Sequence, residues 1–155
     1  MKLRDFIVSD SIIADLQASD RDSALRELVT SLASAGSIPQ TAVDEIVNAL
    51  IKREQNGSTG FGKGVAVPHV KHPAIKQMSG TIGRSSNGLD FAALDHQPVY
   101  SIVLLLSPEN QPQQHLQAMN TVFTNLQKDL FRRFLRQSAT REAIVDLLEE
   151  ADAGK

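Results

Sequence analysis

Two histidines and a run of glycines are the residues of this sequence best suited to chemistry. Residues 57–69, Gly-Ser-Thr-Gly-Phe-Gly-Lys-Gly-Val-Ala-Val-Pro-His, contain four glycines in eight positions and end at Pro68-His69. Pro68 restricts the local backbone and can hold the His69 imidazole in a defined direction, where a ring nitrogen is a good nucleophile. The alternative is a partly exposed histidine at a strand end. The glycines favour the chemical interpretation, because they let backbone amides turn toward a common anion.

The segment Gly57-x-x-x-x-Gly62-Lys63 resembles the start of a nucleotide-binding P-loop. Such a loop needs a strand before it, a helix after it, and Ser or Thr after the Lys to hold magnesium. Here the preceding element is a predicted helix, the following one is extended, and position 64 is Gly. All three requirements fail, so we expect no nucleotide at this loop.

His115 and Arg53 are further candidates. His115 follows Pro112 in the first turn of a predicted helix, where the positive end of the helix favours neutral imidazole and nearby anions. Arg53 ends another predicted helix just before the glycine loop, and its planar pair of donors suits phosphate oxygens. From position alone, a surface histidine and a solvated helix end explain the two residues slightly better.

The remaining histidines do not predict a metal site. His69 and His72 form a His-x-x-His pair, but in an extended segment their side chains point to opposite faces. No nearby Asp or Glu completes a ligand set, and His96 has no visible partner. The chain has no cysteine, which excludes disulfides, thiolate metal sites and cysteine nucleophiles.

Composition narrows the class of protein. The 155 residues fit one domain, and the formal net charge of -2 argues against a general nucleic-acid binder. The first residues lack the long apolar run of a signal peptide, and the longest apolar run, 102–106, is too short to span a bilayer. We therefore expect a cytoplasmic protein with no membrane insertion.

Helices and strands alternate along the chain. A first helix opens at 19–22 and stops near Gly36, a second covers 41–55, a third runs from Pro112 through Leu130, and a last follows Ser138. Strands are predicted at 65–70, 78–84 and 99–106, the last buried on both faces, and more weakly at 12–16. This order indicates an α/β domain with helices on both faces of one sheet.

The segment from Arg53 to His69, Arg-Glu-Gln-Asn-Gly-Ser-Thr-Gly-Phe-Gly-Lys-Gly-Val-Ala-Val-Pro-His, resembles the active-site signature of type-2 enzyme IIA domains. These are the fructose/mannitol and nitrogen-regulatory class of the bacterial phosphoenolpyruvate-dependent phosphotransferase system (PTS). The similarity continues through 82–99, the apolar strand, His-Leu-Gln-Ala-Met at 115–119 and Phe-Arg-Arg-Phe-Leu at 131–135. It implies one domain over 1–155, with a core of about 5–150 and a mixed central sheet.

The resemblance also implies a role for each candidate. His69 matches the family histidine that accepts a phosphoryl group from the phosphocarrier protein HPr or its nitrogen-branch counterpart. His115 matches the second active-site histidine, and Arg53 matches the arginine of the signature. The phosphoryl transfer that the resemblance implies needs no metal, nucleotide or other cofactor. Residues expected to steady the phosphoryl oxygens from the loop are Ser58, Thr59 and Gly60.

Two functions are compatible with this resemblance. One is a regulatory protein of the nitrogen branch, whose phosphorylation state controls which target protein it binds. The other is a transport component that passes phosphate to a cysteine of a IIB domain. Since the chain has no cysteine, a IIB acceptor must be separate, and the expected stand-alone IIA protein favours regulation modestly.

Two positions depart from the family pattern. Lys63 stands where the family usually has Asn, and we expect its positive charge to lie beside the site. His96 stands where a small or polar residue is common, and it implies nothing further. Neither departure removes a group that phosphoryl transfer needs.

Overall fold

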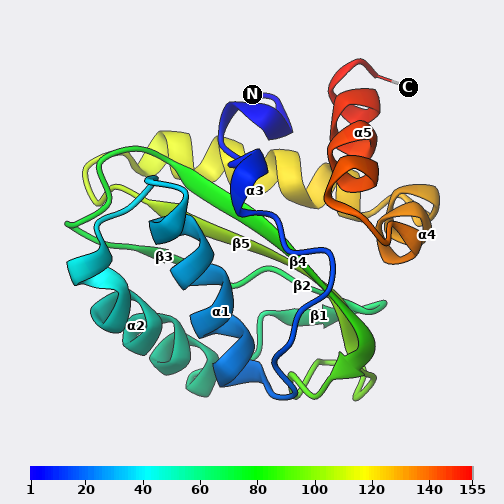
Figure 1. Cartoon of the computed structure of the whole chain (residues 1–155), viewed down its shortest axis with the longest axis horizontal. Helices are drawn as coiled ribbons and strands as arrows, with labels where there is room; N and C mark the ends of the chain where they lie inside the picture. The colour runs from blue at the N-terminus through cyan, green and yellow to red at the C-terminus, as the bar shows by residue number, and fades with distance from the viewer. Residues whose placement is uncertain (155) are drawn as a thin grey trace.

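The computed structural model describes residues 1–154. Within them, short 3-10 turns lie at Leu3–Asp5, Ser9–Ser11 and Gln40–Ala42. The strands are β1 (Gly60–Gly62), β2 (Val65–Ala66), β3 (His69–Lys71), β4 (Ser79–Leu89) and β5 (Val99–Ser107). The helices are α1 (Arg21–Ser34), α2 (Val43–Gln55), α3 (Pro112–Leu126), α4 (Asp129–Gln137) and α5 (Arg141–Asp152) (Figure 1).

Strand β5 is the centre of a mixed sheet. β4 pairs antiparallel with it along one edge, from Ser79↔Leu106 to Leu89↔Val99. Along the other edge β2 and β3 pair with it in parallel, β2 against 101–102 and β3 against 105–107. β1 pairs antiparallel with β2 and extends the sheet outward. The sheet therefore has five strands, but along much of its length only β4, β5 and one parallel partner lie side by side.

The predicted strand at 65–70 is divided into β2 and β3 by Val67-Pro68. Proline has no N–H group and cannot donate to a ladder, so the pairing is interrupted at Pro68. The segment stays against β5 nevertheless, because the Pro68 carbonyl accepts a hydrogen bond from the Leu105 amide, 2.9 Å. The interruption leaves His69 at the first position of β3.

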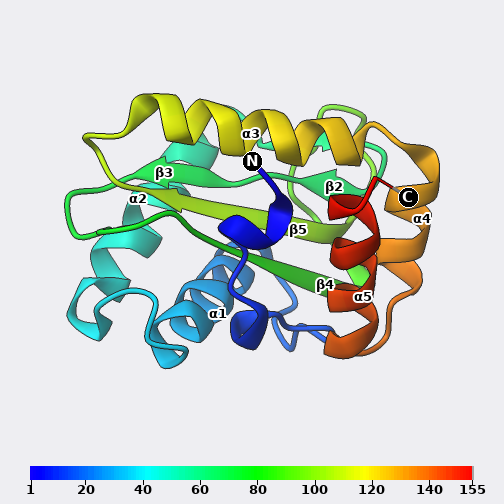
Figure 2. The same ribbon diagram turned by 90° about the horizontal axis from the view of Figure 1, so that it is seen from above.

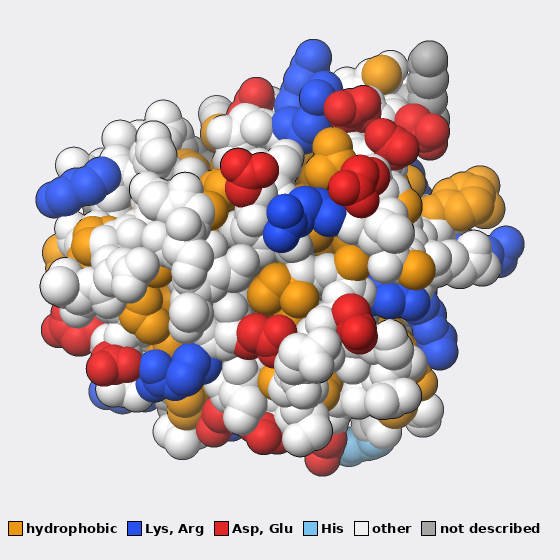
Figure 3. All heavy atoms as spheres, viewed as in Figure 1, with side chains coloured by type: hydrophobic (Ala, Val, Ile, Leu, Met, Phe, Trp, Pro, Cys, Tyr) orange, Lys and Arg blue, Asp and Glu red, His pale blue; other side chains and the backbone are white. Residues whose placement is uncertain are grey.

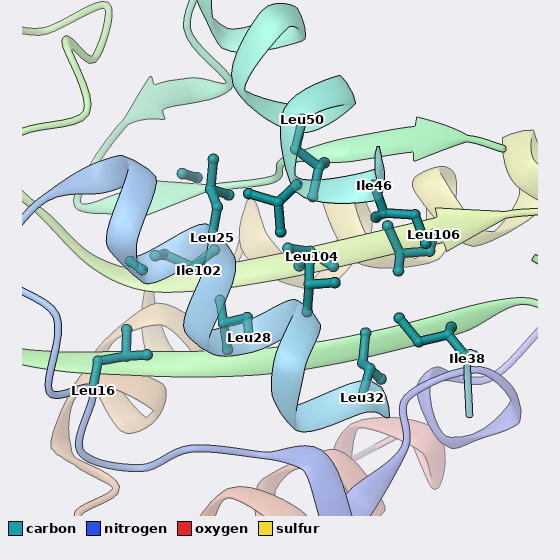
Figure 4. Packing of buried hydrophobic residues seen from close by; sticks show 14 of the residues in the cluster. Leu16, Leu25, Leu28, Leu32, Ile38, Ile46, Leu50, Ile102, Leu104 and Leu106 are labelled. Atoms are coloured by element: carbon teal, nitrogen blue, oxygen red, sulfur yellow. The ribbon is translucent and has the colours of Figure 1, made fainter. Parts of the chain in front are cut away.

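The two faces of the sheet carry separate hydrophobic cores. α1 and α2 cover one face, where Leu25, Leu28 and Leu50 pack against Ile102 and Leu104 (Figure 4). α3, α5 and the N-terminal segment cover the other face (Figure 1). Successive β5 side chains alternate between the cores, which confirms that this strand is buried on both faces. The predicted α/β arrangement, with helices on both faces of one sheet, is confirmed.

The weakly predicted strand at 12–16 is not a strand in the structure. Residues 7 and 13 form isolated parallel bridges to Gly80 and Gly83 of β4. The 3-10 turn at Ser9–Ser11 separates these bridges, so the segment cannot pair continuously. It still covers the outer edge of β4, with amide-to-carbonyl hydrogen bonds such as Ile13 to Ile82, 3.0 Å.

The helix predicted from Pro112 through Leu130 ends at Leu126, and α4 begins at Asp129. Its buried face consists of Ala118, Val122, Asn125 and Leu126. Leu116, expected on the apolar face, is 61% exposed, because it lies one position away from the buried stripe. α3 starts near β3 and ends beside α4 (Figure 2), so its first turn is the end that reaches His69.

Candidate active site

His69 is held by a carbonyl group two residues before it. Its Nδ1 lies 2.8 Å from the carbonyl oxygen of Val67. A carbonyl oxygen can only accept a hydrogen bond, so Nδ1 must carry a proton. In the neutral ring the lone pair is then on Nε2, and the half-buried side chain can present that nitrogen to a reacting group.

His115 lies beside His69 although the two are far apart in the sequence. The ring centroids are 5.6 Å apart and the ring planes are inclined by 46°. This proximity follows from the sheet, because His69 pairs with Leu105 of β5 and β5 leads into α3 after four residues. Nδ1 of His115 lies 2.6 Å from the hydroxyl oxygen of Ser107, the last residue of β5.

The pKa of His115 is lowered from the ordinary histidine value. The largest cause is burial, which disfavours the charged ring. Electrostatic interactions with His69 and with Lys71 lower it further. The start of the helix was expected to favour a neutral imidazole. Removal of the ring from water is a second reason for His115 to be neutral.

The glycine loop reaches the same region through β1 and β2. The Thr59 carbonyl accepts a hydrogen bond from the Val67 amide at 3.1 Å, and Gly60 pairs with Ala66. The loop thus ends against the residues that immediately precede His69. A side chain at Gly60 would be crowded, since a Cβ there would lie 3.0 Å from the Cβ of Ala93.

The loop hydroxyls donate their protons within the protein. Ser58 donates to the Phe91 carbonyl at 2.7 Å and accepts from the Gly60 amide at 2.9 Å. Thr59 donates its hydroxyl proton and its amide proton to the two carboxyl oxygens of Glu54. In this conformation the Ser58 and Thr59 hydroxyls hold the loop in shape, and neither is free to donate to the phosphoryl oxygens that they were expected to face.

Arg53 lies at the end of α2, where the loop begins. Its Nη1 donates to the carbonyl of Gly57 at 2.8 Å, and the side chain is otherwise exposed. This bond holds the guanidinium against the first loop residue. The structure therefore brings His69 and His115 together and places Arg53 at the base of the adjoining loop.

Three supporting residues were not found from the sequence: Val67, Glu54 and Ser107. Glu54 follows Arg53 and is 4% exposed, which its charge alone would not predict. Ser107 comes directly after the strand predicted at 99–106. Its contact with His115 depends on the turn between them, and a periodic pattern of residues in the sequence does not predict such a contact.

Lys63 occupies the turn between β1 and β2. Its φ is 60, a left-handed conformation that Asn adopts more readily than Lys, and its amide donates to Oδ2 of Asp95 at 3.0 Å. That bond and one from the Gln97 amide lower the pKa of Asp95. The turn geometry thus explains physically why Asn is suited to this position.

The Lys63 side chain lies among arginines. It lines an open hollow of about 830 Å³ with arginines of β4 and α4, including Arg84, Arg132 and Arg136. Figure 3 shows Lys and Arg side chains at the right-hand edge, where Figure 1 places α4. The hollow includes neither His69 nor His115. The expectation that Lys63 adds positive charge beside the site stays a prediction.

His72 and His96 take no part in the pair. His72 accepts a hydrogen bond at Nδ1 from the Ala74 amide, 3.1 Å, and its Nε2 lies 3.7 Å from Glu45. His96 lies in a loop with φ 61. Within residues 1–154 no three His, Cys, Asp or Glu side chains are grouped as metal ligands would be. In the same range, no helix has the length and apolar character needed to cross a bilayer.

Comparison with known proteins places this geometry in a family. The family model described as "Phosphoenolpyruvate-dependent sugar phosphotransferase system, EIIA 2" matches residues 5–151. A nitrogen regulatory protein of Bradyrhizobium diazoefficiens is 32% identical over 148 residues, which cover 96% of this chain and 95% of that protein. A fructose-specific EIIABC component of Bacillus subtilis is 28% identical and matches 98% of this chain, which spans only 24% of that longer protein.

Solved structures agree with the sequence matches. The nitrogen regulatory protein IIA-Ntr of Neisseria meningitidis superposes with a TM-score of 0.83 at 28% identity, covering 93% of this chain and 97% of that one. IIA mannitol of Escherichia coli shares the fold, with a TM-score of 0.72 at 18% identity over 91% of this chain and 97% of its own. Because the family model spans nearly all of the sequence, the chain belongs to the type-2 EIIA family of the phosphoenolpyruvate-dependent sugar phosphotransferase system.

Proposed function

We propose that this protein is a cytoplasmic phosphocarrier that accepts a phosphoryl group on Nε2 of His69 and uses its phosphorylation state as a regulatory signal. The donor is HPr or its nitrogen-branch counterpart. One observation carries the proposal: His69 has its Nδ1 bound to a carbonyl and a second imidazole 5.6 Å away. Similarity to a nitrogen regulatory protein over 95% of that protein's length supports the regulatory role.

The transfer is a displacement between two nitrogens. The lone pair of His69 Nε2 forms a bond to phosphorus, the donor's nitrogen–phosphorus bond breaks, and its electron pair returns to the donor imidazole. His69 keeps the proton on Nδ1. The Val67 carbonyl, already 2.8 Å away, stabilises the positive charge that the phosphorylated ring acquires.

His115 and Arg53 are the groups that face the phosphoryl oxygens in this scheme. Arg53 uses one nitrogen to hold Gly57 and has further donors exposed toward solvent. Ser58, Thr59 and Gly60 act indirectly, because their polar groups already have partners in the protein. Ser58 donates to the Phe91 carbonyl, Thr59 donates to Glu54 of α2, and the Gly60 amide donates to Ser58. Their contribution is to fix the backbone on which Arg53 rests.

Phosphorylation in a reconstituted system tests the proposal. The protein is mixed with phosphoenolpyruvate, enzyme I and HPr or its nitrogen-branch counterpart, and acid-labile phosphate is measured. We expect one phosphate per chain on the parent and none on His69→Ala, because no other group is placed to replace Nε2. His72→Ala, whose ring is bound elsewhere, is the matched control and should be labelled normally. Equal labelling of His69→Ala and the parent would show that the assignment of His69 is wrong.

A transport role is the second candidate, favoured by the match to a fructose-specific EIIABC component. In that case the phosphorylated protein donates to a cysteine on a separate IIB domain. A chase with purified fructose- or mannitol-type IIB domains distinguishes the two. Rapid loss of label to IIB cysteine supports transport, whereas retention of label supports regulation. Neighbouring genes for a IIB/IIC transporter or for a nitrogen-related sigma factor would point the same way.

A further inference from the structure

Ser107 carries a buried hydroxyl group that has no role in the transfer described above. It is the last residue of β5, its side chain and backbone are 0% exposed, and it pairs with Lys71 of β3. Its carbonyl accepts a hydrogen bond from the His72 amide at 3.0 Å. Its hydroxyl oxygen lies 2.6 Å from Nδ1 of His115. The paired end of β5 therefore holds this hydroxyl against the His115 ring.

The direction of this hydrogen bond can be assigned from what surrounds it. A hydroxyl group has one proton, and within residues 1–154 the Ser107 side chain makes its hydrogen bond only with His115 Nδ1. If Nδ1 were the donor, the Ser107 proton would be buried without an acceptor, at a cost of about 1–3 kcal/mol. The favourable arrangement has Ser107 donating to Nδ1, which places the proton of the neutral His115 ring on Nε2.

The two histidines are then opposite tautomers. The Val67 carbonyl oxygen can only accept a hydrogen bond, so it keeps a proton on Nδ1 of His69 and leaves Nε2 as a nucleophile. Ser107 donates, so it keeps a proton on Nε2 of His115 and makes that nitrogen a hydrogen-bond donor. The pair therefore offers one lone pair for phosphorus and one N–H group for a phosphoryl oxygen, across 5.6 Å between ring centres.

We propose that Ser107 is a positioning residue which donates its hydroxyl proton to His115 Nδ1 and thereby keeps the His115 proton on Nε2, available to the phosphoryl group on His69. The second half of this statement depends on the proposed phosphocarrier function, whereas the tautomer of His115 does not. The two can therefore fail separately.

The first measurement is the tautomer of His115, read from the nitrogen-15 shifts and two-bond proton couplings of its ring above pH 7. We expect the parent to carry the proton on Nε2. Ser107→Ala, which removes one oxygen atom, should shift the ring toward a mixture of both tautomers. Ser107→Thr keeps the hydroxyl and should restore the Nε2 form. Ser101→Ala is the matched control, a buried serine of the same strand whose hydroxyl does not contact either ring.

The second measurement is the rate of phosphoryl transfer to these variants by quenched flow at saturating donor. We expect Ser107→Ala to be several-fold slower than the parent, and His115→Ala to be slower by about a hundredfold, the usual cost of removing one such donor. Ser107→Thr and Ser101→Ala should stay near the parent rate. A lower kcat with unchanged KM is the expected signature, because the hydrogen bond acts on the reacting group.

The outcomes separate the two parts of the proposal. A parent protein with the His115 proton on Nδ1 would overturn the assignment of Ser107 as donor. A shifted tautomer in Ser107→Ala with an unchanged transfer rate would overturn its role in transfer. If the parent has the Nε2 tautomer but His69 is never phosphorylated, the proposed function fails while the structural assignment of Ser107 stands.

Discussion

At the scale of single residues, the active site relies on uncharged partners to fix its two histidines. Val67 offers a carbonyl to His69 and Ser107 offers a hydroxyl to His115, and neither group adds charge. In the proposed transfer, a site of this kind would bind the phosphoryl group through hydrogen bonds more than through buried ion pairs. That would suit the proposed carrier role, because a group held too tightly on His69 could not be passed on.

Removal of His115 from water has a consequence for stability. Its pKa is lowered from 6.5 by burial, and then by His69 and Lys71, so between that lowered value and 6.5 the unfolded chain binds more protons than the folded one. The stability associated with the neutral ring is therefore fully present above about pH 6.5 and is lost as the pH falls through the folded-state pKa.

We expect this titration to appear in urea unfolding measured between pH 7.5 and 5.5. The unfolding free energy of the parent should fall more steeply toward acid pH than that of His115→Gln, which cannot take up the proton. His96→Gln, whose ring lies in a loop away from the site, is the control and should follow the parent. If the parent and His115→Gln curves run parallel, the pKa of His115 is not lowered by folding.

At the scale of elements, the loop between α2 and β1 is anchored by the end of α2. Glu54 is buried and accepts two hydrogen bonds from Thr59, while Arg53 donates one to the Gly57 carbonyl. Consecutive residues of one helix therefore hold both the start and the middle of the loop. Arg53 and Glu54 thus contact residues four and five positions further along the chain.

Glu54→Gln tests this anchor. The amide side chain keeps one acceptor oxygen but replaces the other with an NH₂ group, so one of the two Thr59 donors loses the oxygen that accepts its proton. We expect a loss of about 1–3 kcal/mol in unfolding free energy and faster hydrogen exchange of the Thr59 amide. Lys52→Gln, an exposed substitution on the same helix, is the control. Unchanged exchange at Thr59 in Glu54→Gln would mean that the loop is held by other contacts.

The sequence predicted the elements whose patterns are local, and it failed where contacts between distant segments decide. α1, α2 and β5 were predicted because an Asp20 cap, helical spacing and a continuous apolar run are legible in one window. The break between α3 and α4 was missed, since apolar residues continue through Leu130. The segment 12–16 was weakly predicted as a strand but forms only one isolated bridge to β4, at Ile13. Its own residues could not reveal how little of it would pair.

The active site shows the same division. His69, His115 and Arg53 were singled out from their neighbours in the sequence and from the resemblance to a family. The tautomer of each histidine depends on Val67 and Ser107, and the Ser107 contact exists only because β5 and α3 fold back on one another. Likewise, only the fold reveals that the hydroxyls of Ser58 and Thr59 are already occupied.

At the scale of the whole molecule, β5 is shared by two hydrophobic cores and the chain ends close the second one. The N-terminal residues Leu3, Phe6 and Ile7 pack with Leu147 and Leu148 of α5 in the core that also supports α3. The first and last segments therefore help to hold the helix that carries His115. A weakened contact between the termini would loosen this face before it affected α1 and α2.

Asp152 is the polar link between these termini. Its carboxylate accepts from the amides of Leu3 at 2.7 Å and Arg4 at 3.1 Å and from Nε of Arg4 at 3.2 Å, and its side chain is 4% exposed. Bonds to a charged acceptor contribute about 1.5–3 kcal/mol each in isolation, and the two amides would lose their partner together. Since such energies are not additive, a total of about 2–4 kcal/mol is expected.

We therefore predict that Asp152→Ala lowers Tm by about 4–16 °C, given about 2–4 °C per kcal/mol for a chain of this size. Asp152→Asn keeps one acceptor oxygen, so its Tm should lie between that of the parent and that of Asp152→Ala. Asp146→Ala, on the exposed side of the same helix, should leave Tm within about 2 °C of the parent, because surface substitutions of this kind change stability little. Calorimetry of the four proteins at pH 7.5 decides. Equal Tm values for Asp152→Ala and Asp146→Ala would show that α5 is held by its apolar face alone, and hydrogen exchange at the Leu3 amide would then be unchanged as well.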